Sequence, residues 1–115
     1  MSRRPAAVLL DEMLGAIARV TRYIEGLDRD QFIADEKTAD AVARNLEVIG
    51  EAAARLPEDV RASDRAIPWQ RIVGLRNRIV HEYFGLDLAL VWSIVTRDLP
   101  VLHTQLTELR NRQKG

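Results

Sequence analysis

The sequence contains no cysteine and carries no net charge, and both absences restrict what the chain can be. Without cysteine it cannot form a disulfide, a thiolate nucleophile or a zinc site built on sulfur ligands. Its 17 basic and 17 acidic residues balance, which argues against a protein that coats nucleic acid by charge alone. The remaining composition, 47% hydrophobic and 30% charged over 115 residues, is typical of a small folded domain. We therefore predict a single domain over residues 1–115.

Long uncharged runs are also missing, so we predict no segment that spans a membrane. The first residues do not resemble a secretory signal peptide, because Arg3 and Arg4 are soon followed by Asp11 and Glu12. These two absences lead us to expect a cytoplasmic protein.

Lysine is scarce: Lys37 and Lys114 are the only lysines among the 17 basic residues. A GC-rich genome is the simplest explanation for this preference. Repeated use of the planar guanidinium group on phosphates or carboxylates is the alternative. Only the positions of the arginines can decide between the two.

No segment alternates between apolar and polar residues over the length of a strand, and apolar residues recur instead at intervals of three and four. The first such stripe runs over residues 10–27 and the second over 39–56, where Pro57 should end the helix. Between them, Asp28 and Gln31 resemble a capping box for a short helix. The stripes consist of Leu10, Met13, Ile17, Val20, Ile24 and Leu27, and of Ala39, Val42, Leu46, Ile49, Ala53 and Leu56.

Two further helices follow a connector over 57–66, which has room for one short helical turn. Pro68 fits the first position of the next helix, and Gly85 is a plausible stop for it. The last helix is predicted to begin after Asp87 as its N-cap and to be kinked at Pro100. Its stripe consists of Leu88, Val91, Trp92, Val95, Leu99, Leu102, Leu106 and Leu109. These features predict an all-α fold, an up-down four-helix bundle with short extra helices.

The helix that begins at Pro68 contains the spacing Arg-x4-His-x-Tyr. At about 100° per residue, Arg76 falls in the middle of the apolar stripe of this helix. Burying an unpaired ion is costly, so Arg76 must have a partner or line a cleft. Glu47 and Glu51 on the preceding long helix are its candidate partners.

His81 falls on a different face of the same helix, about 140° from Arg76. Asn77, one turn earlier, can contact His81, and Gly74 leaves this face thin enough for another backbone to approach closely. Arg76 and His81 would converge if the helix ends or bends near His81. They would also converge if a second copy of the chain contributes across a two-fold axis. From the spacing alone, a solvated histidine and a structural arginine are the more common explanations.

Three stretches of the chain together resemble the HepT-like branch of the HEPN superfamily. They are the motif helix and turn over 68–85, the segment 44–52 with the sequence Arg-Asn-Leu-Glu-Val-Ile-Gly-Glu-Ala, and Trp92 followed by Asp-Leu-Pro at 98–100. The resemblance covers nearly the whole chain. It implies an all-α HEPN bundle that forms a homodimer. It also implies a metal-independent ribonuclease, the toxin of a type VII toxin–antitoxin pair.

The family's functional residues correspond to residues of this sequence without a departure from the motif. Its catalytic arginine and histidine correspond to Arg76 and His81, and the asparagine after the arginine corresponds to Asn77. Its tyrosine, which the antitoxin modifies by adding AMP, corresponds to Tyr83. That antitoxin is an MntA-like minimal nucleotidyltransferase. The resemblance implies no cofactor and no metal ion.

These residue types suit RNA cleavage without a metal ion. Histidine exchanges protons near neutral pH, and the arginine fork stabilises charge that builds up on a phosphate. The hypothesis is that a 2′-hydroxyl attacks the adjacent phosphate, with His81 as acid or base and Arg76 as the phosphate clamp. A 2′,3′-cyclic phosphate end follows. Asn77 would orient His81, while Arg71 and Arg78 would guide the RNA backbone.

Two other interpretations remain open. One is a non-catalytic HEPN module that binds a nucleotidyltransferase or serves it as a nucleotide-binding subunit, which the balanced net charge favours. The other is a helical dimerisation protein whose motif is structural. The second histidine, His103 on the last helix, has no predicted role.

Overall fold

The computed structural model describes residues 5–113, apart from the side chain of Phe84, and within that range it contains helices and no strand. The predicted domain boundaries, 1 and 115, lie outside the described residues. In chain order the elements are α1 (Ala6–Tyr23), α2 (Arg29–Ala34), α3 (Glu36–Arg55), α4 (Glu58–Ala62), α5 (Trp69–His81), the 3₁₀ turn η1 (Tyr83–Gly85), α6 (Leu88–Ser93), the π-helical segment η2 (Ile94–Asp98) and α7 (Leu99–Asn111).

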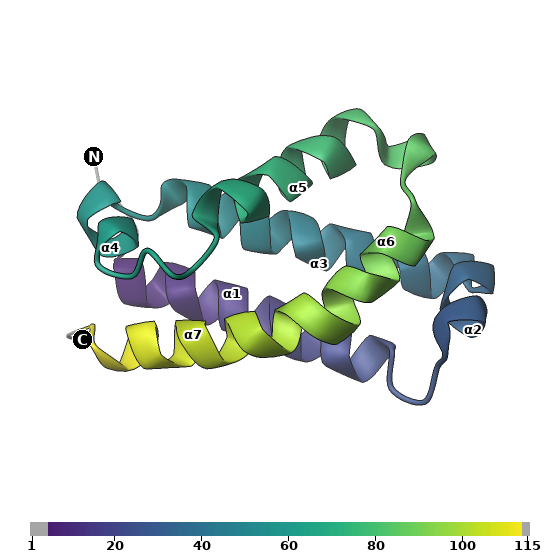
Figure 1. Ribbon diagram of the computed structural model, residues 1–115, viewed down its shortest axis with the longest axis horizontal. Helices are drawn as coiled ribbons and strands as arrows, with labels where there is room; N and C mark the ends of the chain where they lie inside the picture. The colour runs from purple at the N-terminus through teal and green to yellow at the C-terminus, as the bar shows by residue number, and fades with distance from the viewer. Residues whose placement is uncertain (1–4, 114–115) are drawn as a thin grey trace.

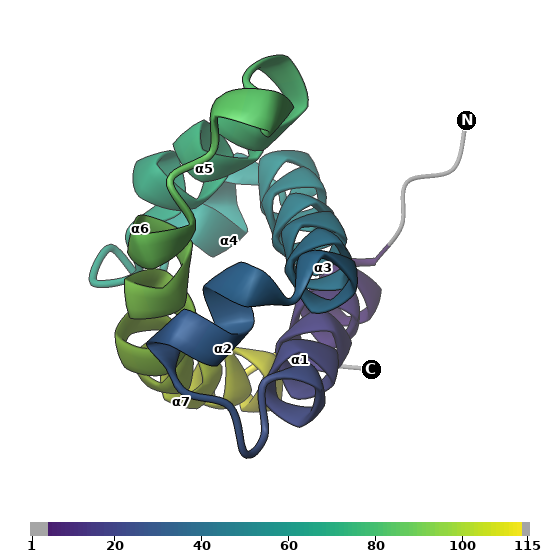
Figure 2. The same cartoon turned by 90° about the vertical axis from the view of Figure 1, so that its right-hand side faces the viewer.

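Four long helical rods run in alternating directions (Figure 1). α1 and α3 lie antiparallel, α5 runs back along α3, and the continuous α6–η2–α7 rod returns beside α1. This arrangement confirms the predicted all-α, up-down bundle. The short α2 lies across one end (Figure 2), where the buried ring of Phe32 sits 5.3 Å from that of Trp92 between centroids. Its capping box between Asp28 and Gln31 is present as predicted.

The predicted apolar stripes form most of the core. All six residues of the second predicted stripe are buried, five of them in α3 and Leu56 just after it, and so are four of the six predicted for the first helix. The other two, Ile24 and Leu27, follow the end of α1 at Tyr23 and are half-buried. In the last rod Val91, Val95, Leu99, Leu102, Leu106 and Leu109 are buried. Intervals of three and four in the sequence therefore identified the inward faces of three of the four rods.

α5 is covered less than the other rods. Trp69 and Ile79 are its buried residues, and Val80 is 48% exposed. The helix approaches α3 most closely at Gly50, where a Cβ atom would lie 2.3 Å from the Cβ of Arg76. No backbone of the described chain approaches Gly74, where a Cβ would meet nothing within 4 Å, so the access predicted there stays a prediction. The glycine that permits the close approach is on the partner helix instead.

The kink predicted at Pro100 lies a few residues earlier, at the π-helical segment η2. α6 begins after Asp87, whose carboxylate accepts hydrogen bonds from the N–H groups of Ala89 and Leu90, as predicted. The π-helical η2 then precedes α7, and the Leu99 N–H donates to the carbonyl of Ile94. Pro100 consequently occupies the first turn of α7, where a missing N–H is tolerated. The rod bends at this widened segment (Figure 1).

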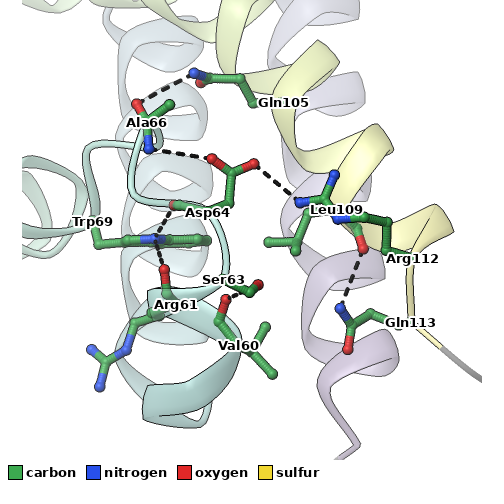
Figure 3. Close-up of polar contacts among 10 residues, drawn as sticks. All are labelled: Val60, Arg61, Ser63, Asp64, Ala66, Trp69, Gln105, Leu109, Arg112 and Gln113. Atoms are coloured by element: carbon green, nitrogen blue, oxygen red, sulfur yellow. Dashed lines mark hydrogen bonds and ion pairs between the residues drawn. The ribbon is translucent and has the colours of Figure 1, made fainter.

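The connector before α5 is tied to the last helix (Figure 3). It forms α4 as its predicted short turn. The indole N–H of Trp69 donates to the carbonyls of Arg61 and Asp64 over 3.0 and 3.1 Å. The Asp64 carboxylate accepts from the Ala66 N–H at 3.2 Å and from the Arg112 guanidinium at 3.3 Å. These contacts fix the position at which the motif helix begins.

Candidate functional site

The motif helix ends at His81, two residues before Tyr83. The prediction that it continues to a stop at Gly85 is wrong, and Gly85 does not adopt the left-handed conformation of a helix-capping glycine. The turn η1 ends the helix instead: the N–H of Gly85 donates to the carbonyl of Glu82, and that of Leu86 to the carbonyl of Tyr83. Hydrogen bonds of the 3₁₀ type provide partners for backbone groups that have no intrahelical partner at the end of an α-helix. Tyr83 therefore lies in the turn η1 and not on the motif helix.

Arg76 is half-buried against α3, with its stem on Gly50. Its Nη1 donates to the Asn77 side-chain oxygen at 2.7 Å, whereas its Nε is buried and has no hydrogen-bond partner. Among residues 5–113 it forms no ion pair with Glu47 or Glu51, the two candidate partners. The reason is geometric: its Cβ sits directly on the α3 backbone, and the guanidinium turns along α5 to its own neighbour.

The two glutamates on α3 behave differently from each other. Glu47 pairs with Arg44 at 3.3 Å, one turn earlier on the same helix. Glu51 is half-buried, and within the described part of the chain it has no ion pair with Arg55 or with Arg76. The predicted role of Glu51 as a partner that supports Arg76 is therefore not supported by an ion pair within the described part of one chain.

His81, the last residue of α5, is exposed to solvent. No hydrogen bond joins its side chain to Asn77 or Arg76 in the described range, and the side-chain oxygen of Asn77 accepts from Arg76. The structure thus joins Arg76 and Asn77 by a hydrogen bond, and none joins His81 to either of them among residues 5–113. The predicted function of Asn77 in orienting His81 stays a prediction.

Tyr83 contacts a residue that the sequence analysis did not identify. Its hydroxyl donates a hydrogen bond to the carboxylate of Asp40 on α3, 43 residues earlier in the chain. This hydrogen bond, followed by partial burial and the charges of Asp40 and Glu36, raises the pKa of Tyr83 from 10.0 to about 12. No local pattern could reveal the pair, because the two side chains meet only when η1 folds back beside α3.

Arg71 and Arg78 are both exposed on α5 and lie two turns apart, on nearly the same face. Arg71 lines a largely apolar groove of about 360 Å³ between α3, α5 and the last rod. Asp98 and Gln105 are the other polar side chains there. The groove thus adjoins the first half of α5, whereas Arg78 lies in its last turn.

Residues 5–113 hold no group of three or more His, Asp or Glu side chains placed to bind a metal ion. Over the same range, no helix has the length and apolar character needed to cross a membrane.

Comparison with known proteins gives one family. The family model described as "Ribonuclease HepT-like" matches residues 13–109. "Putative RNase MJ1380" of Methanocaldococcus jannaschii is 36% identical over 106 residues, which are 92% of this chain and 97% of that protein. "Probable ribonuclease HepT" of Thermococcus cleftensis is 34% identical over 101 residues, 88% of this chain and 92% of that protein. "Putative RNase TTE0752" of Caldanaerobacter subterraneus subsp. tengcongensis is 30% identical, over 91% of this chain and 94% of the relative. No solved structure matches significantly.

Proposed function

The chain belongs to the Ribonuclease HepT-like family of the HEPN superfamily, and from this premise we propose that it is a metal-independent endoribonuclease. In this proposal it acts in the cytoplasm as the toxin of a type VII toxin–antitoxin pair. Arg76 and His81 are its catalytic residues.

The state of Arg76 is the observation that carries this proposal. Its Nε is buried without a partner, and its one hydrogen bond goes to the neutral Asn77 side chain. A half-buried guanidinium without a carboxylate partner is costly as a purely structural feature. It is well suited to a phosphate, which offers the paired oxygens that the guanidinium fork binds.

The proposed reaction is attack of a 2′-hydroxyl on the neighbouring phosphate. The 2′-oxygen–phosphorus bond forms, the bond to the 5′-oxygen breaks, and a 2′,3′-cyclic phosphate end remains. His81 takes or gives a proton, for which its exposed imidazole is accessible. Arg76 stabilises the charge that develops on the phosphate oxygens.

A homodimer would bring the groups of this reaction together. No hydrogen bond joins Arg76 and His81 among residues 5–113, and α5 leaves the apolar side chain of Val80 48% exposed. A second copy packed on this face covers that apolar surface and places two Arg–His pairs in one cleft. Arg71 and Arg78, exposed along the same helix, would then guide the RNA backbone.

The antitoxin in this proposal is an MntA-like nucleotidyltransferase that adds AMP to Tyr83. The added group brings bulk and negative charge beside the catalytic helix. Tyr83 is 37% exposed, so its side chain is accessible to a modifying enzyme. Mass spectrometry after co-expression tests this part, and modification at another residue would overturn it.

The test of the ribonuclease is induction of the chain in a bacterial host beside its Arg76→Ala and His81→Ala variants. We expect growth arrest with loss of intact RNA, abolished by either substitution. Arg55→Ala and His103→Ala are matched controls, since both residues are exposed and lie outside the proposed site. Both controls should arrest growth as the unaltered chain does.

Purified protein separates the proposed chemistry from indirect effects in cells. Cleavage should persist in EDTA and leave 2′,3′-cyclic phosphate ends. Full cleavage by His81→Ala would refute the assignment. No cleavage by any version would instead favour the non-catalytic HEPN module that binds a nucleotidyltransferase.

A further inference from the structure

The hydrogen bond from Tyr83 to Asp40 joins the turn after the motif helix to α3. Tyr83 begins the turn after α5, and Asp40 lies in the second turn of α3. Both side chains are exposed, so the bond lies at the surface. The phenolic oxygen is held in one place with its proton directed at a carboxylate.

We propose that Asp40 positions the Tyr83 hydroxyl for AMP addition and accepts its proton during the transfer. This inference rests on the proposed modification of Tyr83. The co-reactant is a nucleoside triphosphate bound by the nucleotidyltransferase. The bond between the Tyr83 oxygen and the α-phosphorus forms, and the bond from that phosphorus to pyrophosphate breaks. Pyrophosphate leaves, and the hydroxyl proton passes to the Asp40 carboxylate and then to water.

The chemistry of the acceptor explains why a base is needed. The Asp40 hydrogen bond raises the pKa of Tyr83 to about 12, so the phenolate is scarce near neutral pH. Attack by the neutral hydroxyl requires its proton to leave as the new bond forms. An aspartate that accepts a hydroxyl proton during phosphoryl transfer is the arrangement found in protein kinases. Here the carboxylate belongs to the acceptor chain itself and is already in hydrogen-bond contact.

A carboxylate one turn away provides the control. Glu36 affects the pKa of Tyr83 through its charge, whereas Asp40 accepts a hydrogen bond from the hydroxyl. Asp40→Asn keeps an oxygen that can accept the hydrogen bond but removes the group that can take the proton. Asp40→Glu keeps the carboxylate on a longer stem. Glu36→Gln removes a nearby charge and leaves the contact in place.

The experiment measures the initial rate of AMP addition to each purified variant by intact mass. The reaction contains a minimal nucleotidyltransferase of the proposed antitoxin class, Mg²⁺ and ATP. We expect Asp40→Asn to lower the rate at saturating ATP by about 10²-fold, the lower end for general base catalysis. Asp40→Glu should recover part of that loss, and Glu36→Gln should react at close to the unaltered rate. Circular dichroism and thermal unfolding verify that every variant is folded.

The outcomes distinguish this inference from the proposed function beneath it. If the unaltered chain gains no AMP, or if Tyr83→Phe still gains it, modification of Tyr83 itself is wrong. If Tyr83 is modified and Asp40→Asn reacts as fast as the unaltered chain, only the role of Asp40 is wrong. A slow Asp40→Ala beside a fast Asp40→Asn would also overturn proton acceptance and leave Asp40 as a tether.

Discussion

Trp69 and His81 are the first and last residues of α5, and the helix is held very differently at the two. The indole of Trp69 is buried and donates to two connector carbonyls. His81 is exposed and its side chain has no hydrogen bond within the described range, and Arg76, in the same half of the helix, keeps a buried Nε without a partner. Buried polar groups are normally satisfied, and the other exception among the described residues is the Nε of Arg61, near the start of α5. The first residue of α5 is thus fixed by two hydrogen bonds, and the proposed catalytic residues lie in the second half of the same helix.

The same contrast appears in the ion pairs around the two ends. Asp64 in the connector pairs with Arg112, and Asp11 in α1 pairs with Arg110 at 2.9 Å, so the rods are joined by charges near the start of α5. At the far end, Arg76 has no such pair among residues 5–113. Substitutions at the first end should therefore change stability, and those at the second should change activity.

The largest expected effect is that of Arg76→Ala on RNA cleavage. Loss of one group that stabilises transition-state charge lowers kcat by about 10²–10³-fold. The melting temperature should change little, because the loss of the bond to Asn77 and of the stem on Gly50 is offset by removal of a buried nitrogen without a partner. Single-turnover cleavage and thermal unfolding of the same preparation measure both. Arg55→Ala is the control, and a large loss of stability in Arg76→Ala with normal cleavage would reverse the assignment of the two ends.

A pair of glycine substitutions comes next. Gly50→Ala places a Cβ atom 2.3 Å from the Cβ of Arg76, so α3 and α5 must separate. We expect destabilisation of roughly 1–3 kcal/mol, as for overpacked cores. Gly74→Ala meets nothing within 4 Å and should stabilise α5 by up to about 1 kcal/mol through helix propensity. Urea unfolding compares the two, and equal effects would contradict the close approach at Gly50.

The anchored end is tested by Trp69→Phe. The variant keeps an aromatic ring but loses the N–H that donates to Arg61 and Asp64. We expect a loss of about 1–2 kcal/mol of unfolding free energy, since two carbonyls lose their donor. Cleavage per folded molecule should be unchanged. If cleavage falls while stability holds, the two ends of α5 are not independent.

The smallest effect concerns Tyr83 at alkaline pH. Its raised pKa means that the folded chain holds this proton more tightly than the unfolded chain does. The resulting stability is present in full below pH 10 and is lost as the pH rises through about 12. In Asp40→Asn the pKa of Tyr83 should move down toward 10.0, because its hydrogen-bonded carboxylate is gone. Ultraviolet titration against Tyr83→Phe isolates this tyrosine, and an unchanged midpoint would contradict the contact.

Much of the fold was predictable because it depends on patterns within single helices. The stripe from Ala39 to Leu56, the capping box at Asp28 and the N-cap at Asp87 are all local, and the structure confirms each. The motif helix, its exposed histidine and the half-buried arginine also follow from spacing.

The features that the sequence did not predict depend on contacts between separate helices. The close approach of α5 at Gly50 was not predicted, because the depth at which two helices pack depends on the side chains of both helices. The partner of Tyr83 was missed because Asp40 is an ordinary acidic residue of a solvated helix face until η1 folds onto it. The end of α5 at His81 was misplaced because a 3₁₀ turn, which has no strong sequence signal, ends the helix before Gly85.

Gly50 has a consequence for the entropy of Arg76. An arginine side chain has about 2 kcal/mol of rotamer entropy to lose when it is immobilised. Here its stem already rests on the α3 backbone at Gly50, and its Nη1 is already held by Asn77. Most of that ordering is complete before any phosphate arrives, so little further entropy is lost when one binds. The absence of a Cβ atom at Gly50 in α3 thereby holds the Arg76 side chain of α5 in a defined position.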